Sequence, residues 1–286
     1  MDLKKVVFYI VSILLVAFAG LVFAGEIKLD IASMAQTLNI VPSKEETVKI
    51  VYEALKAGDE TVRVQYVGSK KDIESFAKET VEEAFLIDDK ESTDDFDYMK
   101  NKYRGYTAWI SGAGIYTIHY EFDYSETKTQ TDWVNERIEQ ILRELKVENK
   151  SEYEKIKKIH DYIIENTSYD LTVKYNSAYE GLKNNVTACQ GYANMAYKMF
   201  EEAGVNCRII TGIADGEPHA WNIVQVGDVW YNIDCTWDDP IGGGKHSNQY
   251  DYFLKSNNDF KGHERDEEYR TEEFQQKYNM TDHSWK

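Results

Sequence analysis

The stretch Cys189-Gln190-Gly191-Tyr192-Ala193 is followed along the chain by His219-Ala220-Trp221-Asn222 and then by Tyr231-Asn232-Ile233-Asp234. The cysteine begins a helical pattern, the histidine begins a β-rich run, and the aspartate lies inside the next β-rich run. A thiol, an imidazole and a carboxylate that orients the imidazole are the groups that a thiol acyl-transfer site needs. The sequence therefore predicts this chemistry and says little about the substrate.

Cys189 is predicted to lie in the first turn of a helix. Apolar residues continue from it at helical spacing as far as Gly204, which is a natural helix end. At a helix start, unpaired backbone amides and the helix dipole favour the thiolate over the thiol. The alternative is a buried free cysteine that packs as a small hydrophobic group.

Strands are predicted over residues 207–214, 219–226 and 229–237. If Gly227-Asp228 is a two-residue turn, Val226 pairs with Val229 and Trp221 lies opposite Asp234. His219 and Asp234 are then diagonal neighbours on one face of the sheet. Asp234 would fix the tautomer of His219 and leave its other nitrogen for the thiol. Two ordinary edge residues, placed there by chance, are the alternative.

The chain has three cysteines. Because successive side chains of a strand point to opposite faces of the sheet, Cys235 is predicted to point away from the face that carries Asp234. Cys207 and Cys235 fall on strands separated by a third strand, about 10 Å apart. That separation is too large for a disulfide, so we expect two unpaired structural cysteines.

These motifs resemble the bacterial transglutaminase-like superfamily. The resemblance is carried by Cys189–Ala193, His219–Asn222 and Trp230–Asp238, with 30 residues from Cys to His and 15 from His to Asp, and by the lead-in segments 160–162 and 166–170. It covers about residues 150–260 and implies an α+β, papain-like core, in which a Cys-bearing helix packs on an antiparallel sheet carrying His and Asp. It also implies that Cys189, His219 and Asp234 are the catalytic residues. Members include cross-linking enzymes, cysteine peptidases, deglycosylating amidases and inactive scaffolds, so the substrate stays open.

Four segments are predicted along the chain. Residues 1–25 contain the apolar run Val6–Gly25 after Lys4 and Lys5, which predicts a transmembrane anchor or a cleaved signal peptide. Residues 26–41 form a stalk, residues 42–125 a small α/β accessory domain, and residues 126–286 the transglutaminase-like domain. Within the accessory domain, residues 88–97 are predicted to be an exposed acidic loop. Either interpretation of the first segment places the rest outside the cytoplasm, on the membrane or secreted.

Charge and spacing argue against several other functions. The net charge of −17 excludes a nucleic-acid partner, which needs a basic surface. We expect no cofactor and no metal, because no loop has calcium-ligand spacing and Asp238-Asp239 is predicted to be a solvated turn. A zinc site built from Cys189, His219 and Asp234 is the alternative of a different class.

Four of the other histidines are given no catalytic role. His160 lies on an apolar helical stripe and is predicted to be a satisfied core residue. His246, His263 and His283 lie in a polar tail without metal-ligand spacing.

The sequence thus predicts an extracytoplasmic thiol enzyme acting on a peptide or carboxamide bond, a peptidase or amidase. The alternatives are a protein cross-linking transglutaminase and an inactive cell-surface binding or scaffold protein. The expected substrate is a protein or peptide, with cell-wall peptide as one candidate. Tyr192, Trp221 and Trp237 suit the lining of a substrate cleft, and they suit a core equally well.

Overall fold

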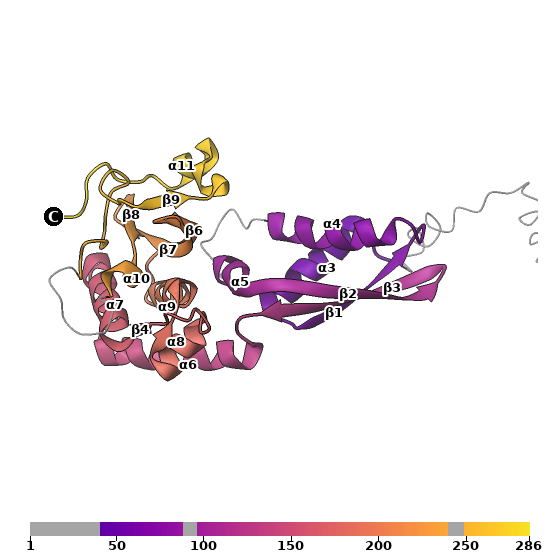
Figure 1. The fold of residues 1–286 in the computed structure, drawn as a ribbon, viewed down its shortest axis with the longest axis horizontal. Helices are drawn as coiled ribbons and strands as arrows, with labels where there is room; N and C mark the ends of the chain where they lie inside the picture. Colours follow the sequence, from indigo (N-terminus) through magenta and orange to yellow (C-terminus); the bar gives the residue numbers. More distant parts are fainter. Residues whose placement is uncertain (1–40, 88–95, 240–248) are drawn as a thin grey trace, which may run out of the picture.

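A computed structural model describes residues 41–87, 96–239 and 249–286. The predicted hydrophobic segment 1–25 and residues 26–40 of the predicted stalk lie outside these ranges. No helix in the described ranges is long and apolar enough to cross a membrane. The fold is mixed α and β with antiparallel sheets, and its two parts lie side by side along the long axis (Figure 1).

The N-terminal part is a three-stranded antiparallel sheet with helices packed against one face. Its elements are α3 (Lys44–Ala57), β1 (Thr61–Val67), α4 (Ile73–Leu86), α5 (Phe96–Lys102), β2 (Tyr103–Ala113) and β3 (Ile115–Tyr124), with strand order β1-β3-β2. The side chain of Ser43 and that of Glu46 form a reciprocal capping box at the start of α3, and Gly58 ends the helix at φ 67°. Val51, Leu55, Val64, Ile118 and Tyr120 belong to a separate apolar core.

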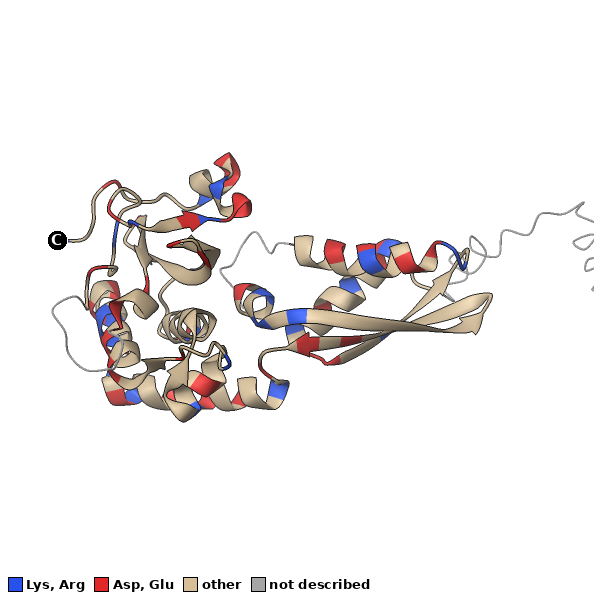
Figure 2. Ribbon diagram, in the orientation of Figure 1, with Lys and Arg blue, Asp and Glu red and all other residues tan. Residues whose placement is uncertain are grey.

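The C-terminal part begins with helices α6 (Lys128–Leu145) and α7 (Glu152–Asn166) and the short elements β4 (Ser168–Tyr169), α8 (Ala178–Asn184) and β5 (Val186–Thr187). Then follow α9 (Cys189–Glu202), β6 (Cys207–Ala214), β7 (Glu217–Val226), β8 (Val229–Ile233) and α10 (Cys235–Asp238). The chain ends with β9 (His263–Arg265), η1 (Glu267–Arg270) and α11 (Glu272–Lys277). Acidic and basic residues are interspersed along α4, α6 and α7 (Figure 2), so the negative charge is spread over the surface.

Helix α9 packs on an antiparallel sheet with strand order β8-β7-β6-β9. Tyr197 and Phe200 of the helix share one apolar core with Ile209, Ala220 and Val224 of the strands. The predicted turn at Gly227-Asp228 is confirmed, because Val226 pairs with Val229.

The predicted strand 229–237 is wrong beyond Ile233. Asp234 is instead the N-cap of α10, and its side chain accepts hydrogen bonds from the backbone N–H groups of Thr236 and Trp237. Capping by an aspartate side chain ends the strand and begins the helix at the same residue.

Hydrogen bonds join the N-terminal and C-terminal parts. The domain boundary between residues 125 and 126 stays a prediction. Asp97, predicted to be in an exposed loop, is buried in α5, where its carboxylate accepts hydrogen bonds from the guanidinium of Arg208 and, at 2.9 Å, from Ile209 N. Asn101 of α5 donates to Asn194 Oδ1 of α9 at 2.8 Å, and Arg104 of β2 donates to Asn176 at 2.9 Å. The helix that begins with Cys189 is therefore in contact with the N-terminal part.

Asp97→Ala should lower the free energy of unfolding by about 3 kcal/mol, because it leaves the Arg208 guanidinium without its carboxylate. Urea-induced unfolding of the full chain measures this loss. Asp132→Ala, on the exposed side of α6, is the matched control and should change stability by less than about 0.5 kcal/mol. Equal effects of the two substitutions would contradict a stabilising role of the Asp97 contact.

Candidate active site

Cys189 is the first residue of α9 and is partly exposed. The segment before it packs tightly on α8, since Thr187 Oγ1 donates to the Ser177 carbonyl at 3.1 Å. A Cβ on Gly191 would come within 1.9 Å of Thr187 Oγ1 and within 2.6 Å of the Ser177 carbonyl oxygen. Gly191 is therefore required for the close approach that positions the start of the helix.

His219 lies near the start of β7, and its side chain is only 7% exposed. Its Nε2 is 2.7 Å from Asp234 Oδ2, and Cys189 lies near enough to raise the pKa of the imidazole. Because Nε2 faces the carboxylate, Nδ1 is the ring nitrogen left for the sulfur. The structure thus brings together the three residues that the sequence singles out.

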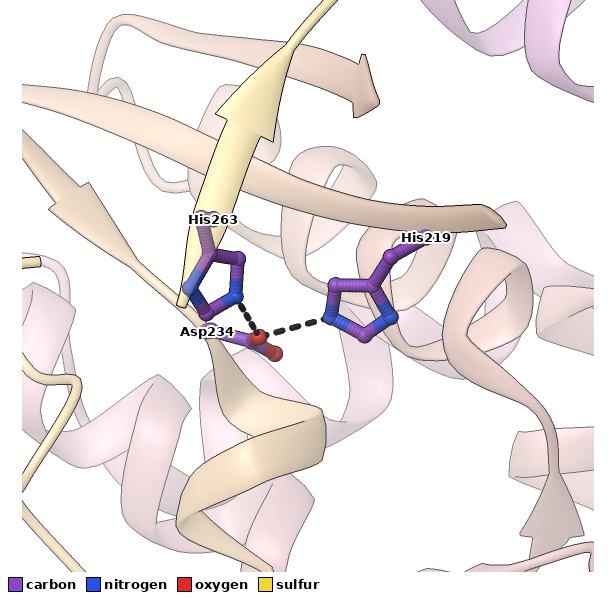
Figure 3. A group of neighbouring side chains, drawn as sticks. All are labelled: His219, Asp234 and His263. Atoms are coloured by element: carbon purple, nitrogen blue, oxygen red, sulfur yellow. Dashed lines mark hydrogen bonds and ion pairs between the residues drawn. The ribbon is translucent and has the colours of Figure 1, made fainter. Parts of the chain in front are cut away.

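The carboxylate of Asp234 is buried, 1% exposed, and each of its oxygens has two partners. Oδ1 accepts from Thr236 N at 2.8 Å and from Trp237 N at 3.2 Å. Oδ2 lies 2.7 Å from His219 Nε2 and 2.9 Å from His263 Nε2, so two imidazoles converge on one oxygen (Figure 3).

The charges of this group stabilise one another. Burial alone would lower the pKa of His219, but the carboxylate of Asp234 and the neighbouring Cys189 raise it to about 10. Burial alone would raise the pKa of Asp234, but the charge of His219 and the hydrogen bonds from both histidines lower it below its usual range. At neutral pH the arrangement favours an imidazolium next to a carboxylate.

His263 is the residue that the sequence interpretation missed. It lies on β9, which pairs with β6 at Ala214 and Gly212, and its side chain is 1% exposed. Its Nδ1 is 3.0 Å from the Lys261 carbonyl oxygen, and its Nε2 is directed at Asp234. Nothing in the tail marks this pairing. The available signal was Gly212, where a Cβ would lie 2.1 Å from the Glu264 carbonyl oxygen.

The three aromatic residues predicted for the cleft lie in different surroundings. Tyr192 and Trp221 are each 1% exposed, within the interior. Trp237 keeps some exposed surface, and its ring lies 4.3 Å from that of His263 and 5.8 Å from that of His219, centroid to centroid. Of the three, only Trp237 has surface that a substrate could contact, and a cleft role stays a prediction.

The predictions for His160 and for Asp238-Asp239 have opposite outcomes. His160 is confirmed as a satisfied core histidine, fully buried with its Nε2 3.0 Å from Asp238 Oδ2. The prediction that Asp238-Asp239 is a solvated turn is wrong. Both residues are buried, because α10 directs Asp238 at His160 and Asp239 at the Tyr192 hydroxyl, which donates to it.

His283 is exposed, and His246 lies outside the described residues.

The two histidines and the aspartate are also residue types that bind metal ions. Ligand atoms of His219, Asp234 and His263 lie within 4.8 Å of one another, the one such group of three or more in the described part of the chain. The two N···O separations, 2.7 and 2.9 Å, are hydrogen-bond lengths. We therefore interpret the group as a hydrogen-bonded one. Cys207 and Cys235 are unpaired, as predicted, and both are buried.

Comparison with known proteins agrees with this geometry. Residues 139–235, which include Cys189, His219 and Asp234, match the sequence model of the Transglutaminase-like superfamily. The chain carries a transglutaminase-like superfamily domain.

The chain is also similar to two curated peptidases and to solved structures. Kyphoscoliosis peptidase of Homo sapiens is 26% identical over 118 residues, and that of Mus musculus is 27% identical over 122 residues. These matches take in 35% and 36% of this chain but only 18% of each relative. A crystal structure described as that of a TGase aligns with 66% of this chain and 53% of its own, at 15% identity and a TM-score of 0.34.

Cys189 should be alkylated by iodoacetamide at pH 6 about 100-fold faster than Cys207 or Cys235. Burial raises the pKa of both other thiols well above the usual value and shields them from the reagent. His219→Ala should slow the labelling of Cys189 about tenfold, and His283→Ala, an exposed control, should leave it unchanged. Mass spectrometry maps the sites, and equal labelling of all three cysteines would refute the thiol–imidazole pair.

His263→Leu should lower the free energy of unfolding by about 1–3 kcal/mol at pH 7, because a buried carboxylate loses a donor. The pKa of Asp234 is lowered in the folded state, so its stabilisation is present above the unfolded value near 4 and is lost as the pH falls below it. The difference between wild type and His263→Leu should therefore shrink in acid. Urea unfolding from pH 7 down to pH 3 measures it. A difference independent of pH would show that His263 acts through packing alone.

Proposed function

We propose that this protein is a thiol enzyme that transfers or hydrolyses an acyl group at a peptide or carboxamide bond, with Cys189 as nucleophile. The observation that carries the proposal is the position of His219, which is hydrogen bonded to the buried Asp234 and near enough to Cys189 for that residue to raise the pKa of the imidazole. The superfamily match supports the reaction class, and the partial coverage of its relatives leaves the substrate open.

In the first step the Cys189 thiolate, whose proton is held by His219, attacks the carbonyl carbon, and the backbone N–H of Cys189 serves as one donor to the developing oxyanion. His219 then gives its proton to the leaving amine, and the C–N bond breaks to leave a thioester. Because the pKa of His219 is raised to about 10, this proton is in place at neutral pH before the substrate binds. Asp234 stabilises the imidazolium and keeps its orientation.

In the second step neutral His219 removes a proton from water, and the hydroxide that forms attacks the thioester carbonyl. The C–S bond breaks, the acid product leaves, and the Cys189 thiolate and the His219 imidazolium are restored. We favour water over an amine acceptor because an exported enzyme meets water at far higher concentration. An exported location, on the membrane or secreted, belongs to the proposal, as does a protein or peptide substrate such as cell-wall peptide.

The acceptor can be tested with a glutamine-containing peptide library, with and without a primary amine probe. Hydrolysis should exceed amine incorporation, and Cys189→Ala should reduce it by about 10³-fold or more. Cys207→Ala is the matched control, with the same change at a thiol away from the site. Incorporation that exceeds hydrolysis would make the protein a cross-linking enzyme. If Cys189 is alkylated selectively but neither product forms on these or cell-wall peptides, the protein would be a scaffold.

A further inference from the structure

A polar pocket of about 280 Å³ lies next to His263. His263 forms part of its wall, together with Trp221, Arg265, Asn257 and, near the rim, Arg270. Apart from His263, which contacts Asp234, no side chain of this pocket has a part in the reaction proposed above.

The guanidinium of Arg265 is turned toward neutral groups only. Its Nη2 donates to Asn232 Oδ1 at 2.8 Å and to Asn257 Oδ1 at 3.2 Å, and it lies 3.5 Å from the sulfur of Met280. No carboxylate within the described ranges forms an ion pair with it, and burial lowers its pKa to about 10. Because a guanidinium stays protonated at neutral pH, the pocket holds a positive charge without a protein counter-ion.

Trp221, which also lines this pocket, carries a second unsatisfied group. Its side chain is 1% exposed, and its indole N–H has no hydrogen-bond partner in the described part of the chain. A buried donor without a partner costs free energy unless a ligand or water accepts from it. Two residues of the pocket wall, one of them charged, thus carry donors that call for an acceptor.

The other charges at the pocket are balanced. Arg270 Nη1 lies 2.9 Å from Glu264 Oε1, and these side chains are 48% and 71% exposed, so they form a solvent-exposed pair at the rim. The charge left inside is the single positive charge of Arg265.

We propose that this pocket binds a small carboxylate, which accepts hydrogen bonds from the Arg265 guanidinium and the Trp221 indole N–H. A carboxylate carries one negative charge, which matches the one unbalanced cation, and its planar oxygens fit the fork of a guanidinium. A phosphate of higher charge would need a further buried cation. The site does not depend on the reaction proposed for Cys189.

The test is a titration of the ¹⁵N-labelled full chain with sodium acetate at constant ionic strength, followed on the indole N–H signals of its six tryptophans. The Trp221 signal, assigned as the one missing in Trp221→Phe, should shift downfield and saturate. In Arg265→Gln the acetate affinity should fall about tenfold or more, because the charge is lost. Arg143→Gln, at an exposed arginine of α6 that does not line the pocket, should leave the affinity unchanged.

Two further measurements test whether the pocket binds a carboxylate. If Arg265→Gln does not fold, calorimetric titration of Trp221→Phe with acetate should still show weaker binding than wild type. Inorganic phosphate at the same ionic strength should shift the Trp221 signal less than acetate. A Trp221 signal that acetate does not move, an affinity that survives Arg265→Gln, or tighter binding of phosphate would overturn the assignment of a carboxylate site.

Discussion

The carboxylate of Asp234 is the group on which the rest of the candidate site depends. One oxygen is held by two backbone N–H groups of α10, and the other receives two imidazoles. A buried carboxylate is costly unless all its acceptor positions are used, and here the helix cap, β7 and β9 together supply the partners. The same contacts that stabilise the charge therefore also fix the ring of His219.

Much of this arrangement follows from local sequence rules. The two-residue turn at Gly227 sets the register of β7 and β8, and that register places His219 near Asp234. The helical pattern that begins at Cys189 places the thiol at a helix start. Both rules act between residues that are close in sequence, which is why they could be applied without a structure.

The predictions from sequence that were wrong or incomplete concern residues whose positions depend on tertiary contacts. Strand alternation placed Asp234 inside a strand, whereas its capping hydrogen bonds start α10. The polar pair Asp238-Asp239 looks solvated in sequence, but α10 turns it toward His160 and Tyr192. His263 could not be found because its strand pairs with β6 from about 50 residues away, at a contact that only the glycine at 212 signals.

The central claim is that Asp234 keeps His219 protonated, with Nε2–H directed at the carboxylate and Nδ1 at Cys189. Two-bond ¹H–¹⁵N NMR spectra of the histidine side chains test it most directly. We predict that His219 gives the signals of an imidazolium from pH 6 to 9 and that in Asp234→Asn it becomes neutral at lower pH. A neutral His219 at pH 7 in the wild type, or one that titrates alike in both proteins, would contradict the account.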